Sequence, residues 1–105
     1  MCQTKILSWK DQTLISQCDE CQVIYIWHNN LMLSLNKDEF FSFKRTVGGL
    51  SFYKHCLPFP DGEERVILRT PNQDISFVFA YEEYELFKDS IDEAIHMTEV
   101  YALMQ

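Results

Sequence analysis

The chain is poor in basic residues. Its 105 residues include nine Lys and Arg against sixteen Asp and Glu, which gives a net charge of −7. Nucleic-acid binding depends on clustered Lys and Arg that displace counterions from the phosphates, whereas the longest basic run here is the pair Lys44-Arg45. The charge therefore disfavours nucleic acid as a partner.

Long apolar runs are also absent. A membrane-spanning helix needs about 20 mostly apolar residues, and no stretch approaches that length. The opening MCQTKILSWKDQ lacks the apolar core of about 7–15 residues that a secretory signal carries. We therefore expect a cytoplasmic protein whose cysteines stay reduced.

The sequence contains no recognisable catalytic motif. Its three glycines cannot build a phosphate-binding loop, and the G-x-S-x-G motif of serine hydrolases is missing. His55 and Cys56 are neighbours, but adjacent residues of a strand point to opposite faces, so they do not form a nucleophile and its base. The sequence thus predicts a protein that is not an enzyme.

What is present is the composition of an ordinary globular domain. Apolar residues make up 47% and charged residues 24% of the chain, which fits neither a disordered nor a fibrous protein. A chain of this length buries roughly 65% of the surface that it exposes when unfolded, so it can form a core without metal or disulfides. We expect a single domain over residues 1–105.

Apolar alternation and turn residues divide the chain into short strands and two helices. Asn36 is a good helix N-cap, Glu39 is its capping-box partner three residues later, and Gly48-Gly49 end that helix. From residue 81 the apolar period becomes helical. The predicted elements are strands at 5–9, 13–17, 23–28 and 31–35, a helix at 37–47, strands at 50–57, 64–70 and 75–80, and a helix at 81–103.

These elements predict an α+β fold. An antiparallel sheet of six to seven strands carries two helices on one face, and the second of them is a long C-terminal helix. Residues 23–44 align with residues 66–88 so that Glu39 meets Glu83 and Phe40 meets Tyr84. Two interpretations of the alignment stay open: a pseudo-repeat of a β-β-α unit, or a chance likeness of two hairpin–helix segments.

Two resemblances follow from these patterns. The order of elements resembles, in topology only, the Pur-type and Whirly-type folds that bind single-stranded nucleic acid, without their motifs or their basic charge. The opening MC, the CDEC with an apolar hairpin after it, ERVILRTPN and the closing acidic helix together resemble a small family of uncharacterised bacterial proteins. This second resemblance implies a stand-alone domain of unknown function and supplies no catalytic residues.

The cysteines are the nearest approach to a recognisable site. If the first hairpin turns at residues 10–12, Cys2 falls opposite the turn that carries Cys18 and Cys21, the two thiols of the CxxC in CDEC. Structural zinc takes four nitrogen or sulfur ligands. Cys56, with His55 as the alternative, is the candidate for the fourth.

Two other interpretations of these cysteines stay open. They are thiols packed at a sheet edge without a ligand, or a redox pair. The carboxylates of Asp19 and Glu20 make a thiolate beside them less stable, which counts against redox chemistry.

Aromatic residues are frequent, with eight Phe, five Tyr and two Trp. An exposed set of aromatics on a sheet can stack on bases or hold a peptide, although core packing accounts for most strand aromatics more simply. The aromatics in question are Trp9, Tyr25, Trp27, Phe52 and Tyr53.

The last turns of the C-terminal helix are apolar around much of their circumference, beyond what one sheet-facing side uses. We expect contact with another protein there, through Met97, Val100, Tyr101 and Met104. The sequence therefore favours a non-enzymatic protein-interaction or regulatory module that forms a homodimer, with structural zinc left open. The alternatives are a regulator that binds single-stranded nucleic acid on a sheet face and a thiol-redox protein.

Overall fold

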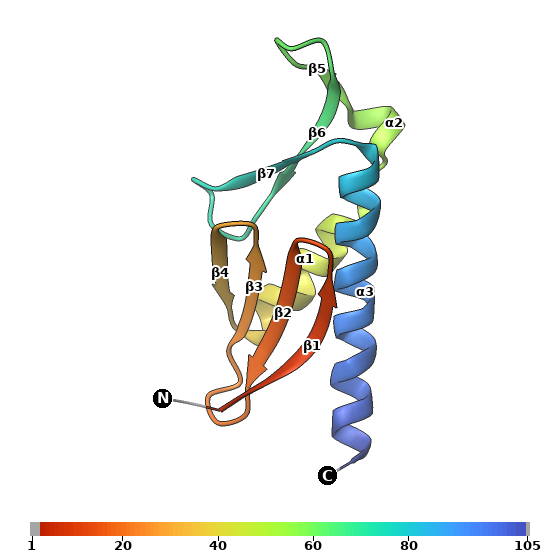
Figure 1. The fold of residues 1–105 in the computed structure, drawn as a ribbon. Coiled ribbons are helices and arrows are strands. Elements are labelled where there is room, and N and C mark those ends of the chain that lie inside the picture. The colour runs from red at the N-terminus through yellow and green to blue at the C-terminus, as the bar shows by residue number, and fades with distance from the viewer. Residues whose placement is uncertain (1–2, 105) are drawn as a thin grey trace.

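The structure is a computed structural model that describes residues 3–104. The described chain forms a four-stranded antiparallel sheet, a three-stranded antiparallel sheet and three helices (Figure 1). The first sheet consists, in spatial order, of β1 (Thr4–Lys10), β2 (Thr13–Cys18), β3 (Ile24–His28) and β4 (Leu31–Leu35). The second consists of β5 (Leu57–Pro58), β6 (Glu64–Arg69) and β7 (Ser76–Phe79). The helices are α1 (Lys37–Gly49), α2 (Phe52–His55) and α3 (Tyr81–Leu103).

Tight turns join the strands within each hairpin of the first sheet. Asp11 (φ 52°) and Asn29 (φ 54°) hold the first position of two-residue turns, between β1 and β2 and between β3 and β4. Asp and Asn adopt positive φ more readily than other non-glycine residues, because their short side chains bond to the nearby backbone. The two hairpins that the sequence predicts are confirmed.

Helix α1 begins at the predicted residue and ends at Gly49, two residues later than the predicted end at residue 47. The Asn36 side chain accepts a hydrogen bond from the Glu39 N–H (2.8 Å), and the Glu39 carboxylate accepts one from the Asn36 N–H (2.9 Å). This reciprocal pair is the predicted capping box. Phe40, Phe43 and Val47 form the buried face of the helix.

Helix α3 begins with half of such a box. The Glu83 carboxylate accepts a hydrogen bond from the Ala80 N–H (2.8 Å), but Ala80 has no side-chain oxygen with which to return it. Tyr84 follows Glu83 as Phe40 follows Glu39, and both rings are buried. The aligned residues of the two hairpin–helix segments therefore have the same structural roles.

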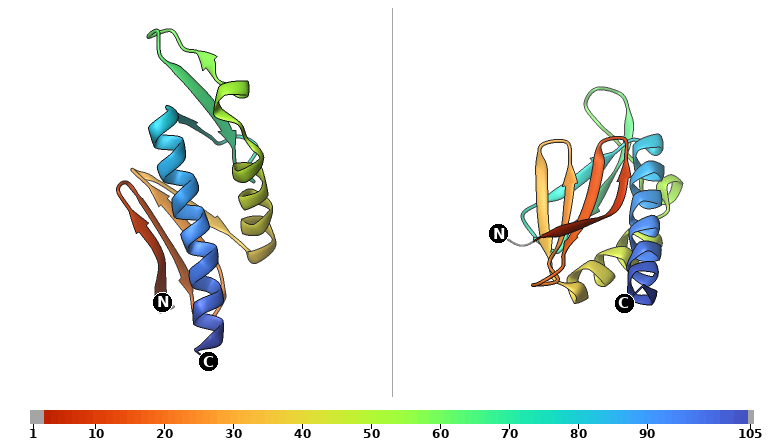
Figure 2. Two further views of the ribbon diagram at one scale, coloured as in Figure 1. Left: turned by 90° about the vertical axis from the view of Figure 1, so that its right-hand side faces the viewer. Right: turned by 60° about the horizontal axis from the view of Figure 1, so that its bottom comes forward.

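Helices α1 and α3 lie on the same face of the four-stranded sheet, as the sequence predicts (Figure 2). Helix α3 has 23 residues, a length of about 34 Å, and it contacts β1 and β2 as well as β6 and β7. One helix therefore runs along both sheets, and a single apolar core is continuous beneath it.

The prediction of a strand over residues 50–57 is wrong, because helix α2 occupies the middle of that segment and only its last residue, Leu57, belongs to a strand, β5. The Cys56 N–H donates to the Phe52 carbonyl (2.8 Å), and the His55 N–H donates to the Ser51 carbonyl (3.0 Å). Phe52 is the one buried residue of the segment. The segment therefore lacks the second buried position that a half-buried strand needs.

The prediction of one sheet of six to seven strands is also wrong, since the described strands form a sheet of four and a sheet of three. Among these strands, β7 pairs with β6 and not with an edge of the first sheet. Its Phe77 and Phe79 rings lie edge-on to the His28 ring at the end of β3, with centroids 5.5 and 5.3 Å apart. Long-range ring packing, which local patterns do not encode, thus sets the second sheet over the end of the first.

A buried tyrosine hydroxyl links the two long helices. Tyr84 of α3 is 2% exposed, and its hydroxyl lies 2.6 Å from the Val47 carbonyl oxygen and 2.7 Å from that of Leu50. These carbonyls are at the C-terminal end of α1, where the N–H partners of a continuing helix are lost. Burial raises the pKa of Tyr84, so the hydroxyl stays a neutral donor.

Replacing Tyr84 by Phe tests this link. We expect Tyr84→Phe to lower the free energy of unfolding by about 1–3 kcal/mol, because the hydrogen bonds of the hydroxyl to the Val47 and Leu50 carbonyl oxygens are lost while the ring still fills the core. Urea unfolding followed by circular dichroism measures the change. Tyr53→Phe is the matched control, because Tyr53 is 78% exposed. Equal effects of the two substitutions would contradict the role of the Tyr84 hydroxyl.

His28 lies at the junction of the two sheets. Its Nδ1 is 2.8 Å from the Thr13 hydroxyl oxygen. Its ring is also edge-on to the Phe87 ring of α3, at 5.8 Å between centroids, in addition to the two rings of β7. Burial lowers the pKa of His28, although the carboxylates of Glu83 and Asp11 oppose this shift. The folded protein therefore favours the neutral ring.

This lowered pKa predicts a pH-dependent stability. As the pH falls through the unfolded-state pKa of about 6.5, the unfolded chain binds a proton at His28 before the folded chain does, so the free energy of unfolding decreases. Urea unfolding between about pH 7.5 and 5.5 measures this loss. We expect His28→Gln to reduce the slope and His96→Gln, at an exposed position of α3, to retain it. Identical slopes in all three proteins would rule out His28 as the source.

Candidate functional site

The outer face of the four-stranded sheet, which is the face turned away from α1 and α3, carries a row of large apolar side chains. Trp9 pairs with Leu14, Leu14 with Trp27, and Trp27 with Met32. Directly opposed residues of antiparallel strands point to the same face. These four side chains therefore form one row across all four strands, which we call the tryptophan row.

Most of the tryptophan row is exposed. The exposed fraction is 68% for Trp9, 48% for Trp27 and 55% for Met32, and Leu14 between the two tryptophans is half-buried. A shallow hollow of about 190 Å³ lies where the row meets the hairpin turns, and it is lined by Trp9, Leu14, Trp27, Asp11, Gln12 and Asn29. The row thus combines exposed apolar surface with a shallow hollow at one end.

A second row, in which two serines alternate with Ile6 and Tyr25, lies beside the first. Ile6 pairs with Ser16, Ser16 with Tyr25, and Tyr25 with Ser34. Residues two apart along a strand are about 7 Å apart, which sets the spacing of the two rows. We call this second set the serine row. Ile6 is 49% exposed, so the apolar surface continues along β1.

An irregularity in β1 turns Trp9 outward. The register shifts between Ile6 and Ser8, so Leu7 and Ser8 are both buried, at 1% and 2% exposure. Strict alternation would place Trp9 on the same face as Leu7, whereas a bulge redirects the residues that follow it. The interpretation that core packing accounts for most strand aromatics therefore does not hold for Trp9 and Trp27.

Neither row contains a charged residue. The two lysines of β1 belong to the other face, where Lys5 pairs with Gln17 and Lys10 with Thr13. Both are also engaged in ion pairs: the Lys5 Nζ lies 3.4 Å from an Asp19 carboxylate oxygen, and the Lys10 Nζ lies 3.1 Å from one of Glu93. The outer face is therefore uncharged within its two rows, and the hydroxyls of Ser16, Tyr25 and Ser34 are among its polar side-chain groups.

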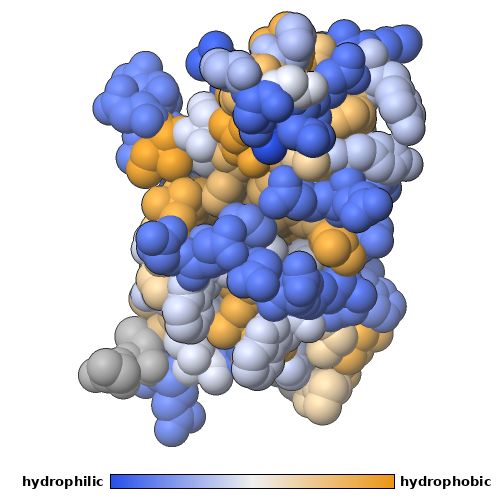
Figure 3. Space-filling model, turned by 45° about the horizontal axis from the view of Figure 1, so that its top comes forward, coloured by the Kyte–Doolittle hydropathy of each residue, from blue (hydrophilic) through white to orange (hydrophobic). Residues whose placement is uncertain are grey.

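The C-terminal turns of α3 are partly used by the fold itself. On the face of the molecule that Figure 3 shows, apolar residues reach the surface at several separate places between hydrophilic ones. Of the four predicted interaction residues, Met97 and Tyr101 pack against the core, and the Tyr101 hydroxyl donates to the Ile6 carbonyl (3.2 Å). Val100 is half-buried and Met104 is 73% exposed. A contact through this end of α3 stays a prediction.

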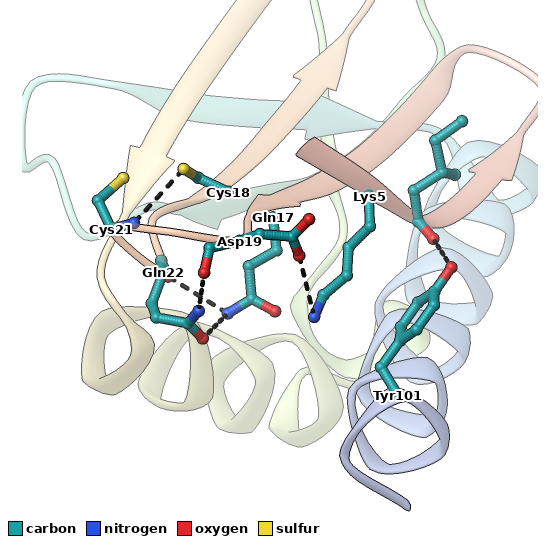
Figure 4. Close-up of polar contacts among 8 residues, drawn as sticks. Lys5, Gln17, Cys18, Asp19, Cys21, Gln22 and Tyr101 are labelled. Carbon is teal, nitrogen blue, oxygen red and sulfur yellow. Dashed lines mark hydrogen bonds and ion pairs between the residues drawn. The ribbon is translucent and has the colours of Figure 1, made fainter. Parts of the chain in front are cut away.

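The CDEC segment forms the turn between β2 and β3 (Figure 4). The Cys21 N–H donates to the Cys18 sulfur (3.4 Å), so the two residues close one turn, in which Cys18 is buried and Cys21 is exposed. The Gln22 side chain, at a residue with φ 65°, donates to the Asp19 carbonyl (2.8 Å). The turn is therefore held by its own backbone and amide groups, and by the ion pair of Asp19 with Lys5.

The described residues do not complete the predicted metal site. Between residues 3 and 104, no three His, Cys, Asp or Glu side chains gather in a position to hold a metal ion. Cys56 and His55 are not brought to the CDEC turn, because residues 52–55 form α2 instead of a strand that returns to the first sheet. The Cys56 thiol contacts Glu64 instead (3.5 Å). Cys2 lies outside the described residues, so zinc at Cys2, Cys18 and Cys21 stays a prediction.

A larger hollow, of about 580 Å³, lies between α1 and the end of β6. The side chains that line this hollow offer little for catalysis. The Glu39 carboxylate at its rim is occupied in capping α1, and no cysteine or histidine lies in its wall. The residues that line it are Asp38, Glu39, Ser42, Phe43, Thr46, Arg69, Thr70 and Pro71.

Comparison with known proteins finds one matching family, and its function is unknown. The model of a family described as "Family of unknown function (DUF6686)" matches residues 1–100. Neither a curated protein nor a solved structure gives a match. The comparisons thus add no support for the Pur-type or Whirly-type topology. None of the described helices is both long enough and apolar enough to cross a membrane.

The position of Cys56 provides a test of the metal hypothesis. Because its thiol lies beside Glu64, we expect Cys56→Ser to leave the zinc content of the purified protein unchanged. Native mass spectrometry measures that content, and Cys21→Ser, which alters the CDEC turn itself, is the matched comparison. Zinc that is bound by the wild type and lost from Cys56→Ser would contradict the placement of this thiol.

Proposed function

Because the chain belongs to DUF6686, a family of unknown function, its own surface is the guide to its role, and we propose that it is a non-enzymatic protein-interaction module. Its contact surface is the outer face of the four-stranded sheet. Its partner is a protein that presents an uncharged, apolar surface of similar size. The observation that supports this proposal is the exposed tryptophan row.

The tryptophan row is a costly feature to leave in water. An aromatic side chain offers about 150–250 Å² of surface, so at 68% and 48% exposure Trp9 and Trp27 leave roughly 200–300 Å² unburied. Covering this area would contribute roughly 4–7 kcal/mol before the costs of association. Tryptophan is also the residue type most enriched at the energetic centres of protein interfaces. The row is therefore well suited to anchor a partner.

The alternative of single-stranded nucleic acid fits the outer face less well. Stacking aromatics in such sites work together with cations that follow the phosphate backbone. The two rows contain no Lys or Arg, and the lysines of β1 are paired with carboxylates on the other side of the sheet. The net charge of −7 adds repulsion. Apolar aromatics without cations favour a protein surface.

The non-enzymatic part of the proposal is supported by the state of the polar groups. Desolvation and the hydrogen bond to Glu64 raise the pKa of the Cys56 thiol, which makes this cysteine a poor nucleophile. His28 has its Nδ1 against Thr13 and its ring among phenylalanines, so it is placed to pack and not to move protons for a substrate.

Photo-crosslinking in the producing cell tests the proposal. A photoreactive phenylalanine analogue at position 27 replaces one large exposed ring by another, and the same analogue at Tyr53 is the matched control, because Tyr53 is 78% exposed but lies in α2. We expect irradiation to join a protein to position 27 and not to position 53. The proposal fails if position 27 yields no protein adduct, or yields only RNA or DNA.

A further inference from the structure

We infer that the partner on the outer face is a second copy of this chain, packed face to face about a twofold axis. This inference rests on the proposed function, because it names the occupant of the same surface. The axis lies in the plane of the interface, runs across the strands, and passes midway between the tryptophan row and the serine row. It brings the tryptophan row of one copy over the serine row of the other.

The two rows match each other under this rotation, with a large side chain over a small one at two of the four positions and two apolar side chains in contact at the other two. Rotation about this axis keeps each strand over its own counterpart and exchanges the two rows. Leu14 of one copy then lies over Ser16 of the other, and Met32 lies over Ser34. The other two positions set Trp27 against Tyr25, as an aromatic contact, and Trp9 against Ile6, as an apolar one. Ridges over valleys across stacked sheets about 10 Å apart are the normal packing of β-sandwiches.

The charge distribution also favours a second copy. Two copies carry −7 each, so the repulsion between them is smallest when they meet through a surface that itself carries no carboxylate. The two rows meet this condition, whereas α3 exposes an acidic surface. The exposed acidic residues of α3 are Glu82, Glu83, Asp89, Asp92 and Glu99. A basic partner would therefore be drawn to α3, while the outer face suits an equally uncharged face, and this chain carries one.

The same geometry predicts the effect of salt. The twofold axis brings the Asp11 end of the outer face near the CDEC turn of the other copy, which carries Asp19 and Glu20. Like charges at this rim weaken the dimer at low ionic strength, and salt screens them. Association therefore strengthens with added salt, which is opposite to the response of a nucleic-acid complex.

The size of the face indicates a dimer that dissociates on dilution. Four strands about 4.8 Å apart and about five residues of each strand cover roughly 300 Å² in plan. A standard interface buries about 800 Å² per partner. An interface this small is expected to dissociate in the micromolar range, so monomer and dimer coexist at accessible concentrations.

Sedimentation equilibrium of the purified chain tests the inference. Across about 1–300 µM, we expect the apparent mass to rise from that of one chain, 12.5 kDa, toward twice that value. The apparent dissociation constant should fall as salt is raised. Trp27→Ser should weaken association by about tenfold or more, whereas Tyr53→Ser, which is outside the face, should leave it unchanged.

A charge exchange tests the relative placement of the two copies. Met32→Glu and Ser34→Lys each put an unpaired charge into the interface, so each should weaken the dimer by about tenfold. The double variant Met32→Glu/Ser34→Lys has the net charge of the wild type and sets each new carboxylate over a new ammonium group of the other copy. Its dissociation constant should return to within about threefold of the wild-type value.

The outcomes separate the inference from the proposed function. Concentration-dependent dimerisation with rescue by the double variant supports the inference. A dimer that survives Trp27→Ser but is lost in Met104→Ser overturns it in favour of the end of α3. A monomer at every concentration also overturns it. In that case a crosslink from position 27 to a different protein keeps the proposed function, and no protein crosslink rejects both.

Discussion

The packing of one helix against two sheets is the constraint on which the rest of the structure depends. The centroid of the Phe87 ring in α3 lies 5.1 Å from the ring centroid of Phe77 and 4.9 Å from that of Phe79, both in the second sheet. It lies 6.0 Å from the ring centroid of Phe43 in α1. One turn earlier, the Tyr84 hydroxyl bonds to the last carbonyls of α1. A sheet must bury its apolar face against a second layer, and α3 contributes to that layer for both sheets.

The same constraint determines what is left for contact. Helices α1 and α3 both occupy the inner face of the first sheet, so that face is consumed by the core. Within residues 3–104 no helix packs on the outer face, which nevertheless carries Trp9, Trp27 and Met32 at about half exposure or more. Large exposed apolar sets without a structural use are typical of binding surfaces. The two uncharged rows of the outer face are thus the part of the first sheet that the fold itself leaves exposed.

Local features of the fold were predictable and long-range ones were not. The capping box at Asn36 and the hairpin turns depend on neighbours in sequence, and they agree with the sequence patterns. The separation into two sheets depends on phenylalanines of β7 meeting His28, about fifty residues away in the chain. Trp9 illustrates the limit most clearly, since alternation with the buried Leu7 would place it in the core, and a bulge turns it out. For Trp27, which alternates with the buried Ile26, the outward direction was readable.

Both tryptophans of the chain lie in the tryptophan row, so their fluorescence is sensitive to whether the outer face is covered. Indole fluorescence of the wild type therefore measures directly whether a second copy covers the face. On dilution from about 100 to about 1 µM, a range that brackets the dissociation expected for so small an interface, the emission maximum should move to longer wavelength as the rings return to water. An emission maximum that does not change over this range would contradict self-association through the outer face.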